Sequence, residues 1–179
     1  MKTRSVKVSD PPSDPVERPI LLGVIGGETP PEKARHLAEE VGALAAQRGA
    51  IIVCGGHGGV MESVCKGAAR AGGTTIGVLP SSDRHTANPY VTIPIVTAMS
   101  TARNAIIVRT AEALIAIDGA YGTLTEIAYA LDLKHKVFLL ESWPLERIPV
   151  DENLFEKVST PRDAVERALA YARENRSRP

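Results

Sequence analysis

Five short apolar segments alternate along the chain with longer segments whose apolar residues recur at helical spacing. The apolar segments cover residues 20–25, 50–54, 74–79, 113–117 and 137–140. Such nearly continuous apolar runs predict strands that are buried on both faces, which is typical of a parallel sheet. The intervening pattern predicts helices over about residues 30–48, 60–71, 99–108, 123–134 and from 160 onwards.

Strands that alternate with helices imply an α/β fold in three layers, with helices on both faces of the sheet. Because crossover connections are right-handed, the five strands are expected in the doubly wound order 3-2-1-4-5. This order reverses between residues 20–25 and 113–117, and ligands of such folds bind in the crevice at the reversal.

The remaining segments carry weaker patterns. Residues 1–19 contain four prolines and predict a mobile N-terminal arm, and residues 20–179 predict a single domain. Residues 80–90 predict a loop, and residues 90–95 predict a short extended piece that Pro94 limits. Residues 141–158 are expected to be irregular.

A glycine turn follows three of the predicted strands: Gly26-Gly27, Gly55 to Gly59, and Gly119 to Gly122. Glycine allows a tight turn and lets a ligand approach backbone N–H groups, and the helix N-terminus after the third turn adds partial positive charge. Each turn alone could serve only to connect a strand to a helix. Three turns at one crevice favour a bound phosphate or similar anion. Glu28 works against an anion unless its carboxylate bonds a hydroxyl group or points away.

The specific nucleotide-binding signatures are absent from the sequence. The Gly56-His57-Gly58 segment lacks the third glycine of a dinucleotide-binding turn, since Met61 occupies that position, and no GxxxxGK[ST] segment occurs. We interpret His57 as a solvent-facing loop residue and Trp143 as a partly buried packing residue, so neither is a candidate for binding.

Two charged residues near the turns each allow two interpretations. Thr123 and Glu126 fit a capping box, in which the glutamate reaches back to the backbone; the alternative is a functional carboxylate. Arg103 lies in the first turn of the preceding helix, where the macrodipole disfavours a cation. It is either retained there for a site or exposed with its charge in water. The buried stripe of the helix after Thr123 is expected at Leu124, Ile127, Ala128 and Leu131.

Composition narrows the function classes. Lys+Arg and Asp+Glu both number 21 in the 179 residues, so the formal net charge is zero and a broad nucleic-acid surface is disfavoured. Aromatic residues are only 4% of the chain, too few for stacking single strands. Cys54 and Cys65 are expected to be small buried residues, and no metal-binding spacing is present. No signal peptide or membrane-length apolar run occurs, which predicts a cytoplasmic protein without a membrane partner.

Three segments resemble the LOG (Lonely Guy) family, whose members are often labelled lysine decarboxylase-like. Residues 119–126 resemble its PGGxGTxxE motif, and residues 99–104 resemble its Met-x-x-x-Arg-Lys segment. Residues 55–61 resemble its second-strand glycine turn. The resemblance extends from about Leu21 to Glu141, which is most of the chain.

The resemblance implies a Rossmann-like fold and a homodimer or homotetramer. The enzymes of this family are phosphoribohydrolases, which cleave the N-glycosidic bond of a nucleoside 5′-monophosphate. It also implies that Arg103 and Glu126 are the catalytic pair. The carboxylate would stabilise the positive charge that develops on the ribose or orient water, and the arginine would position the substrate or keep the glutamate ionised.

The chain departs from the family motifs at Asp118 in place of proline, Ala120 in place of the second glycine and Asn104 in place of lysine. This variant pattern is closer to the branch that includes molybdenum-cofactor carrier proteins, which bind a phosphate-bearing pterin. We therefore place binding of a phosphorylated nucleotide-like or molybdopterin-type molecule ahead of phosphoribohydrolase activity. No cofactor or metal is required, and the expected ligands are phosphate, an AMP-like nucleotide or molybdopterin. The candidate binding residues are Gly26, Gly27, Gly55, Gly56, Gly58, Gly59, Met99, Gly119, Ala120, Tyr121, Gly122 and Thr123.

Overall fold

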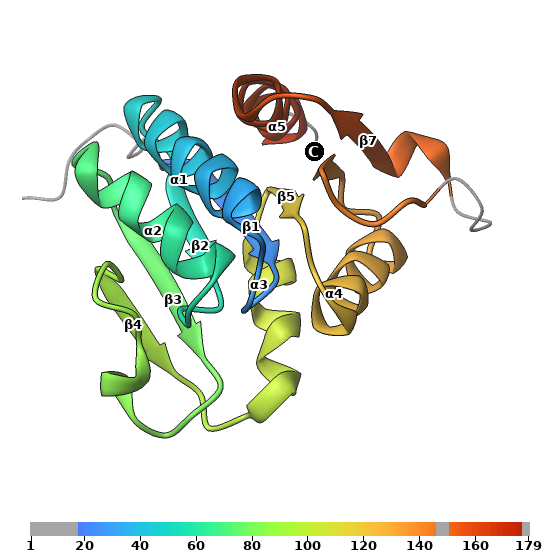
Figure 1. The fold of residues 1–179 in the computed structure, drawn as a ribbon. Helices are drawn as coiled ribbons and strands as arrows, with labels where there is room; N and C mark the ends of the chain where they lie inside the picture. Colours follow the sequence, from blue (N-terminus) through green and yellow to red (C-terminus); the bar gives the residue numbers. More distant parts are fainter. Residues whose placement is uncertain (1–17, 146–150, 177–179) are drawn as a thin grey trace, which may run out of the picture.

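Parallel strands form one sheet through the centre of the molecule. The structure is a computed structural model that describes residues 18–145 and 151–176; most of the predicted N-terminal arm, residues 1–17, lies outside the described residues. The sheet has seven strands in the order β4-β3-β2-β1-β5-β6-β7 (Figure 1). Every neighbouring pair is parallel. The strands are β1 (Leu21–Gly26), β2 (Ile51–Cys54), β3 (Thr75–Leu79), β4 (Ile93–Val96), β5 (Ala113–Ile117), β6 (Val137–Leu140) and β7 (Phe155–Val158).

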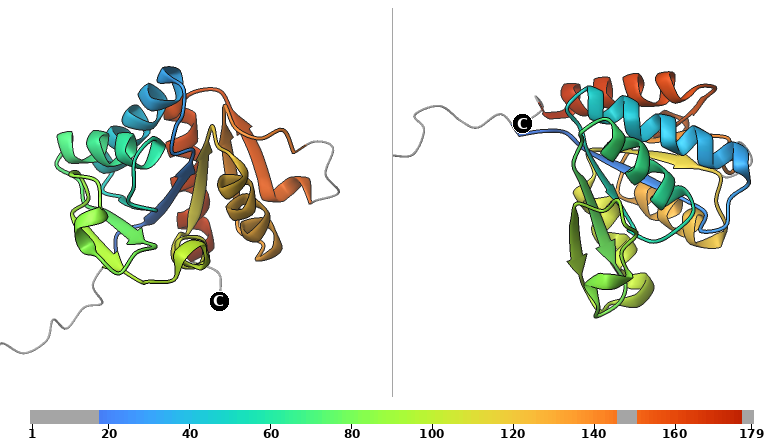
Figure 2. Two further views of the ribbon diagram at one scale, coloured as in Figure 1. Left: turned by 60° about the horizontal axis from the view of Figure 1, so that its bottom comes forward. Right: turned by 60° about the vertical axis from the view of Figure 1, so that its left-hand side comes forward.

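Helices cover both faces of the sheet. One core cluster joins it to α1 (Glu32–Gln47), α2 (Val60–Arg70) and α5 (Pro161–Arg176). A second cluster on the opposite face joins it to α3 (Asn104–Thr110) and α4 (Tyr121–Asp132). Figures 1 and 2 show the resulting three layers. The predicted α/β class, a Rossmann-like doubly wound parallel sheet, is confirmed. Short 3-10 helices lie at η1 (Arg84–Thr86), η2 (Ser100–Arg103) and η3 (Glu152–Leu154).

The predicted strand order differs from the observed one at the two edges. The five predicted strands lie in the predicted spatial order, as β3-β2-β1-β5-β6. Two further strands, β4 and β7, extend the sheet at its two edges. β7 lies within the segment that was expected to be irregular, so that expectation is wrong. An edge strand bonds to one neighbour only and needs few apolar side chains: Phe155 pairs with Val137 and Val158 with Leu140, while Glu156 and Lys157 lie between them.

Alternation along the strands separates the two cores. Leu22 and Ile115 pack toward α1, α2 and α5, whereas Leu114 packs toward α3 and α4. Cys54 and Cys65 are both buried free thiols, with their Sγ atoms 3.5 Å apart.

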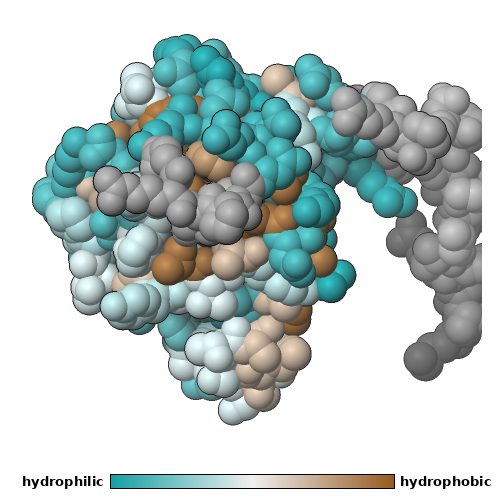
Figure 3. All heavy atoms as spheres, turned by 90° about the vertical axis from the view of Figure 1, so that its right-hand side faces the viewer, coloured by the Kyte–Doolittle hydropathy of each residue, from teal (hydrophilic) through white to brown (hydrophobic). Residues whose placement is uncertain are grey.

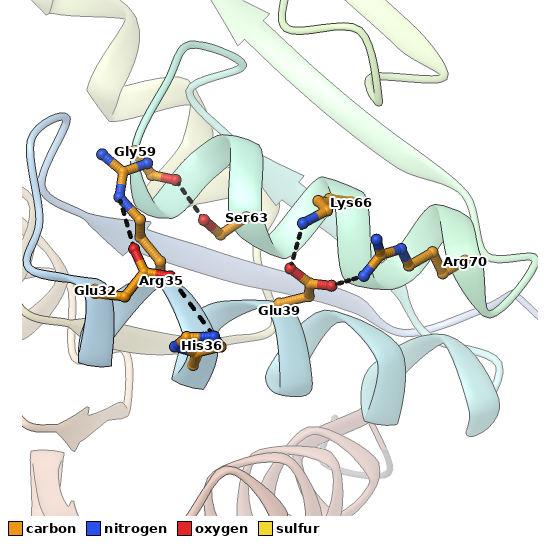
Figure 4. A network of polar contacts seen from close by, with 8 residues as sticks. All are labelled: Glu32, Arg35, His36, Glu39, Gly59, Ser63, Lys66 and Arg70. Atoms are coloured by element: carbon orange, nitrogen blue, oxygen red, sulfur yellow. Dashed lines mark hydrogen bonds and ion pairs between the residues drawn. The ribbon is translucent and has the colours of Figure 1, made fainter.

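Polar contacts join α1 to α2 (Figure 4). Lys66 Nζ donates to Glu39 Oε2 at 2.8 Å, and Arg70 contacts the other carboxylate oxygen. Ser63 Oγ donates to the Gly59 carbonyl oxygen at 2.9 Å, which ties α2 to the glycine turn before it. α2 is therefore joined to α1 along its C-terminal half and to the glycine turn at its N-terminal end.

The predicted start of the first helix, at about residue 30, is wrong. α1 begins at Glu32, and Pro31 occupies the N-cap with ψ of 160° and no side-chain cap. A residue that precedes proline disfavours the helical region, so Pro30 cannot be the first helical residue and the helix starts two residues later.

The face formed by α4, α5 and β7 is mostly hydrophilic, with a smaller group of hydrophobic residues near its centre (Figure 3). Within residues 18–145 and 151–176, no helix combines the length and the apolar character needed to cross a membrane.

Candidate functional site

The carboxyl ends of β1, β2 and β5 border one cavity of about 380 Å³. It lies where the strand order reverses, because β1 stands between β2 and β5. Eight of the predicted site residues line it: Gly26, Gly27, Gly55, Arg103, Ala120, Gly122, Thr123 and Glu126. Sheet order thus brings together three turns that are far apart in the sequence.

Other predicted glycines lie behind the cavity wall and shape the turns. The backbone φ angles of Gly56, Gly59 and Gly119 are 76°, 69° and 122°, a conformation that residues with a side chain rarely adopt. A Cβ on Gly59 would overlap the carbonyl oxygens of Gly27 and Glu28. Gly59 therefore allows the second turn to approach the first, whereas Gly56 lies against β3 and Gly119 against Thr123.

The remaining predicted residues also lie outside the cavity. Tyr121 is 81% exposed and its ring lies 6.2 Å from that of Trp143. Met99 is 47% exposed. Gly58 lines a neighbouring hollow instead.

The N-terminus of α4 presents its first turn to the cavity without a side-chain cap. Ala120 is the N-cap residue and carries no acceptor group. The first N–H groups of a helix have no partner within the helix, so these amides are available to a ligand. Gly122 lines the cavity, and a Cβ on it would meet no atom within 4 Å, so no neighbouring side chain crowds this turn. This is an arrangement that binds anions.

The capping box expected of Thr123 and Glu126 is wrong. α4 begins at Tyr121, so Glu126 falls in its second turn and is only 7% exposed. The buried face of α4 consists of Thr123, Glu126, Ile127, Ala130 and Leu131, and the predicted Ala128 is exposed. Glu126 therefore points inward with the apolar residues rather than back along the backbone.

Arg103 is buried at the last residue of η2 and is 9% exposed, so it is not the exposed arginine of the alternative interpretation. Its Nη1 lies 3.8 Å from Glu126 Oε1, longer than a hydrogen bond. A Cβ on Gly55 would lie 2.5 Å from Arg103 Nη2 and 2.6 Å from Met61 Sδ. A side chain at this position would displace the ends of Arg103 and Met61, so the glycine lets the guanidinium lie where it does. Its Nε atom is buried and makes no hydrogen bond within the part of the chain that the structure describes.

Burial changes the acidity of both members of this pair. Burial raises the pKa of Glu126 to about 7, and the nearby Arg103 charge opposes part of the rise. Burial also lowers the pKa of Arg103, against the attraction of Glu126. The carboxyl group can therefore gain or lose a proton near neutral pH, while the guanidinium stays charged.

His57, which the sequence interpretation left out of the site, lines the cavity together with Glu28, whose role it left open. His57 and Glu28 stand at its edge, with His57 Nδ1 3.8 Å from Glu28 Oε1. The position of His57 inside a glycine turn at a strand end was the only sequence pattern that pointed to it.

Two of the residues that depart from the family motifs lie at the site. Asn104, next to Arg103, lines the cavity. Asp118 has φ of 52°, which proline cannot adopt, and its Oδ2 lies against Gly27. Across the described residues, no group of three or more His, Cys, Asp or Glu side chains could hold a metal ion.

Comparisons with known proteins agree with this fold and with the LOG-like resemblance. The model of the SLOG cluster4 family matches residues 19–173. The structure of the molybdenum cofactor binding protein from Rippkaea orientalis is 34% identical with a TM-score of 0.81, over 86% of this chain and 97% of that one. The Moco carrier protein from Chlamydomonas reinhardtii is 34% identical with a TM-score of 0.80, over 88% and 99%. A protein of Archaeoglobus fulgidus is 43% identical over 112 residues, which is 63% of this chain and 74% of that protein.

The raised pKa of Glu126 predicts a pH-dependent stability. In the unfolded chain the carboxyl ionises near 4.5, whereas in the folded protein it ionises near 7. As pH rises through this window the unfolded state loses its proton first, so the free energy of unfolding should fall by roughly 3 kcal/mol relative to a Glu126→Gln variant. Urea unfolding of both proteins between pH 4.5 and 8 measures this difference.

Glu40→Gln, on the exposed side of α1, is the matched control, and its free energy of unfolding should follow that of the wild type across this window because the variant keeps Glu126. If the difference in unfolding free energy between the wild type and Glu126→Gln stays constant across this pH range, the carboxyl group of Glu126 does not have a raised pKa in the folded protein.

Proposed function

The chain belongs to the SLOG cluster4 family, and we propose that it binds a phosphorylated nucleotide-like or molybdopterin-type molecule in the cavity at the sheet reversal. The observation that carries this proposal is the uncapped first turn of α4, which opens onto a cavity that also holds Arg103. Backbone amides and a guanidinium on one cavity provide donors and positive charge for a phosphate group.

The size and position of the cavity support a small ligand. Its volume of about 380 Å³ is at the lower end of the range for small-molecule sites. Two similar structures are a molybdenum cofactor binding protein and a Moco carrier protein. A phosphate-bearing pterin would place its phosphate at Gly122 and Thr123, with Arg103 as the charged partner.

Filling the space above the first turn of α4 should block the ligand and leave the fold intact. Gly122→Leu adds a side chain where no atom lies within 4 Å of the Cβ position, so it should project into the cavity. We expect at least about tenfold weaker binding of AMP and GMP by calorimetry, since the ligand phosphate loses close approach to the amides. Loss of the heat stabilisation that these nucleotides give should accompany it.

Ala128→Leu is the matched control, because it adds the same side chain to an exposed position of the same helix. It should bind both nucleotides as the wild type does. Wild-type-like binding by Gly122→Leu would place the phosphate elsewhere.

The buried pair of Glu126 and Arg103 favours phosphoribohydrolase activity as a second candidate function. A carboxyl group whose pKa is about 7 exchanges protons readily at neutral pH, as a general acid or base must. In its ionised form it would also stabilise positive charge on a ribose.

Incubation with AMP distinguishes the enzyme from a carrier. An enzyme should release free adenine, and Glu126→Gln should lower the rate at least about 100-fold, because a general acid–base group contributes about that much. Glu40→Gln should keep the wild-type rate. Heat stabilisation by AMP without any release of adenine would support binding alone.

The homodimer or homotetramer implied by the LOG resemblance is proposed to form through the β4 edge. Ile93, Ile95, Val96 and Met99 are exposed apolar residues on or next to this edge strand, a combination that favours association. Ile95→Glu should shift the mass measured by light scattering toward the monomer. Ala170→Glu, on the exposed side of α5, should leave it unchanged. A wild-type protein of monomer mass would refute the proposal.

A further inference from the structure

A second hollow adjoins the cavity beside the β2 turn. It measures about 360 Å³, and Glu28 and His57 line both spaces. The contact between these two residues therefore marks the border. Glu62 of α2 and Asn88 line the second hollow but not the first cavity. A ligand longer than the first cavity can continue past His57 into this second space.

The turn that separates the two spaces is fixed in position. Asn88 is buried, and its Nδ2 lies 2.9 Å from the His57 carbonyl oxygen and 3.2 Å from that of Gly56, donating to both. Its Oδ1 accepts from the Tyr90 N–H at 3.1 Å. Because the amide is used on both sides, the second hollow has a defined wall before any ligand enters.

The two spaces offer different charged groups. The first holds Arg103 and the α4 N-terminus together with the carboxyl groups of Glu28 and Glu126. The second has the carboxylates of Glu28 and Glu62, and its lining within the described residues includes no lysine or arginine. Glu62 Oε2 lies 3.9 Å from the place where a Cβ on Gly58 would stand, so this carboxylate is beside the turn. A ligand that spans both spaces must be anionic at one end and rich in hydrogen-bond donors at the other.

We infer, building on the proposed function, that the second hollow takes the ring of the ligand and that Glu28 and Glu62 select a ring edge with adjacent N–H donors. A carboxylate accepts two parallel hydrogen bonds from a ring N–H and a neighbouring amino group. Guanine and pterin share this 2-amino-4-oxopyrimidine edge. Adenine has an unprotonated ring nitrogen beside its amino group, and that lone pair would face the carboxylate. The second hollow therefore prefers guanine-like and pterin-like rings over adenine.

Calorimetric titration with GMP, IMP and AMP tests this selection. The three share ribose and phosphate, and IMP lacks only the 2-amino group of GMP. We expect GMP to bind at least about tenfold more tightly than IMP or AMP, because only GMP offers both donors to a carboxylate. Glu62→Gln and Glu28→Gln should reduce the ratio of GMP to AMP affinity at least about fivefold. Glu40→Gln, which removes an equal charge from an exposed position, should leave the ratio unchanged.

The ratio separates ring selection from general charge effects, since removing a carboxylate strengthens phosphate binding equally for all three nucleotides. Equal affinity for GMP and AMP, or a ratio that neither variant alters, overturns the inference and leaves the proposed phosphate site standing. Titration with guanosine and adenosine, which lack the phosphate, tests the opposite outcome. If guanosine binds more tightly than adenosine, and GMP binds no more tightly than guanosine, the ring selection stands and the phosphate site is refuted. Absence of binding by every nucleotide and nucleoside overturns both.

Discussion

Burial of the Arg103 guanidinium is the constraint on which the candidate site depends. Removing this cation from water is costly, and the cost is offset only where a negative group or an acceptor lies close. Glu126 supplies part of the compensation at 3.8 Å, without a direct hydrogen bond. The guanidinium occupies the space that a side chain at Gly55 would fill, so a larger residue there would displace it. An anionic ligand would complete the compensation, which links the stability of the site to its occupancy.

The hydrophobic pattern predicted the strands of the sheet centre because buried parallel strands leave an unmistakable apolar run. It missed β7, since an edge strand is held by backbone bonds to one neighbour and Glu156 and Lys157 interrupt the apolar pattern. It also misplaced the buried face of α4. Thr123 and Glu126 were assigned to a local cap because polar residues at this spacing usually serve the backbone. Glu126 instead faces Arg103 at the end of η2, a contact between distant residues that no local pattern encodes.

The glycine turns show a second limit of sequence reasoning. Gly122 and Gly59 were predicted for the same role, yet the first leaves open space at the cavity and the second allows two turns to approach closely. The residue type is identical, so only φ and the distance to neighbouring atoms distinguish a ligand contact from a packing requirement. Topology was easier to predict than local roles, because right-handed crossovers restrict the order of strands.

The protonation state of Glu126 separates the two candidate functions chemically. Its pKa of about 7 means that neutral and ionised forms coexist at neutral pH. The neutral form removes a negative charge beside Arg103 and so favours a phosphate group, which suits a protein that holds an anionic ligand. The ionised form opposes the phosphate but stabilises a cationic ribose, which suits glycosidic cleavage. Entry of a phosphate would itself raise the pKa of this carboxyl and favour its neutral form. Binding through Arg103 therefore works against hydrolysis unless the phosphate lies farther from Glu126 than the ribose does.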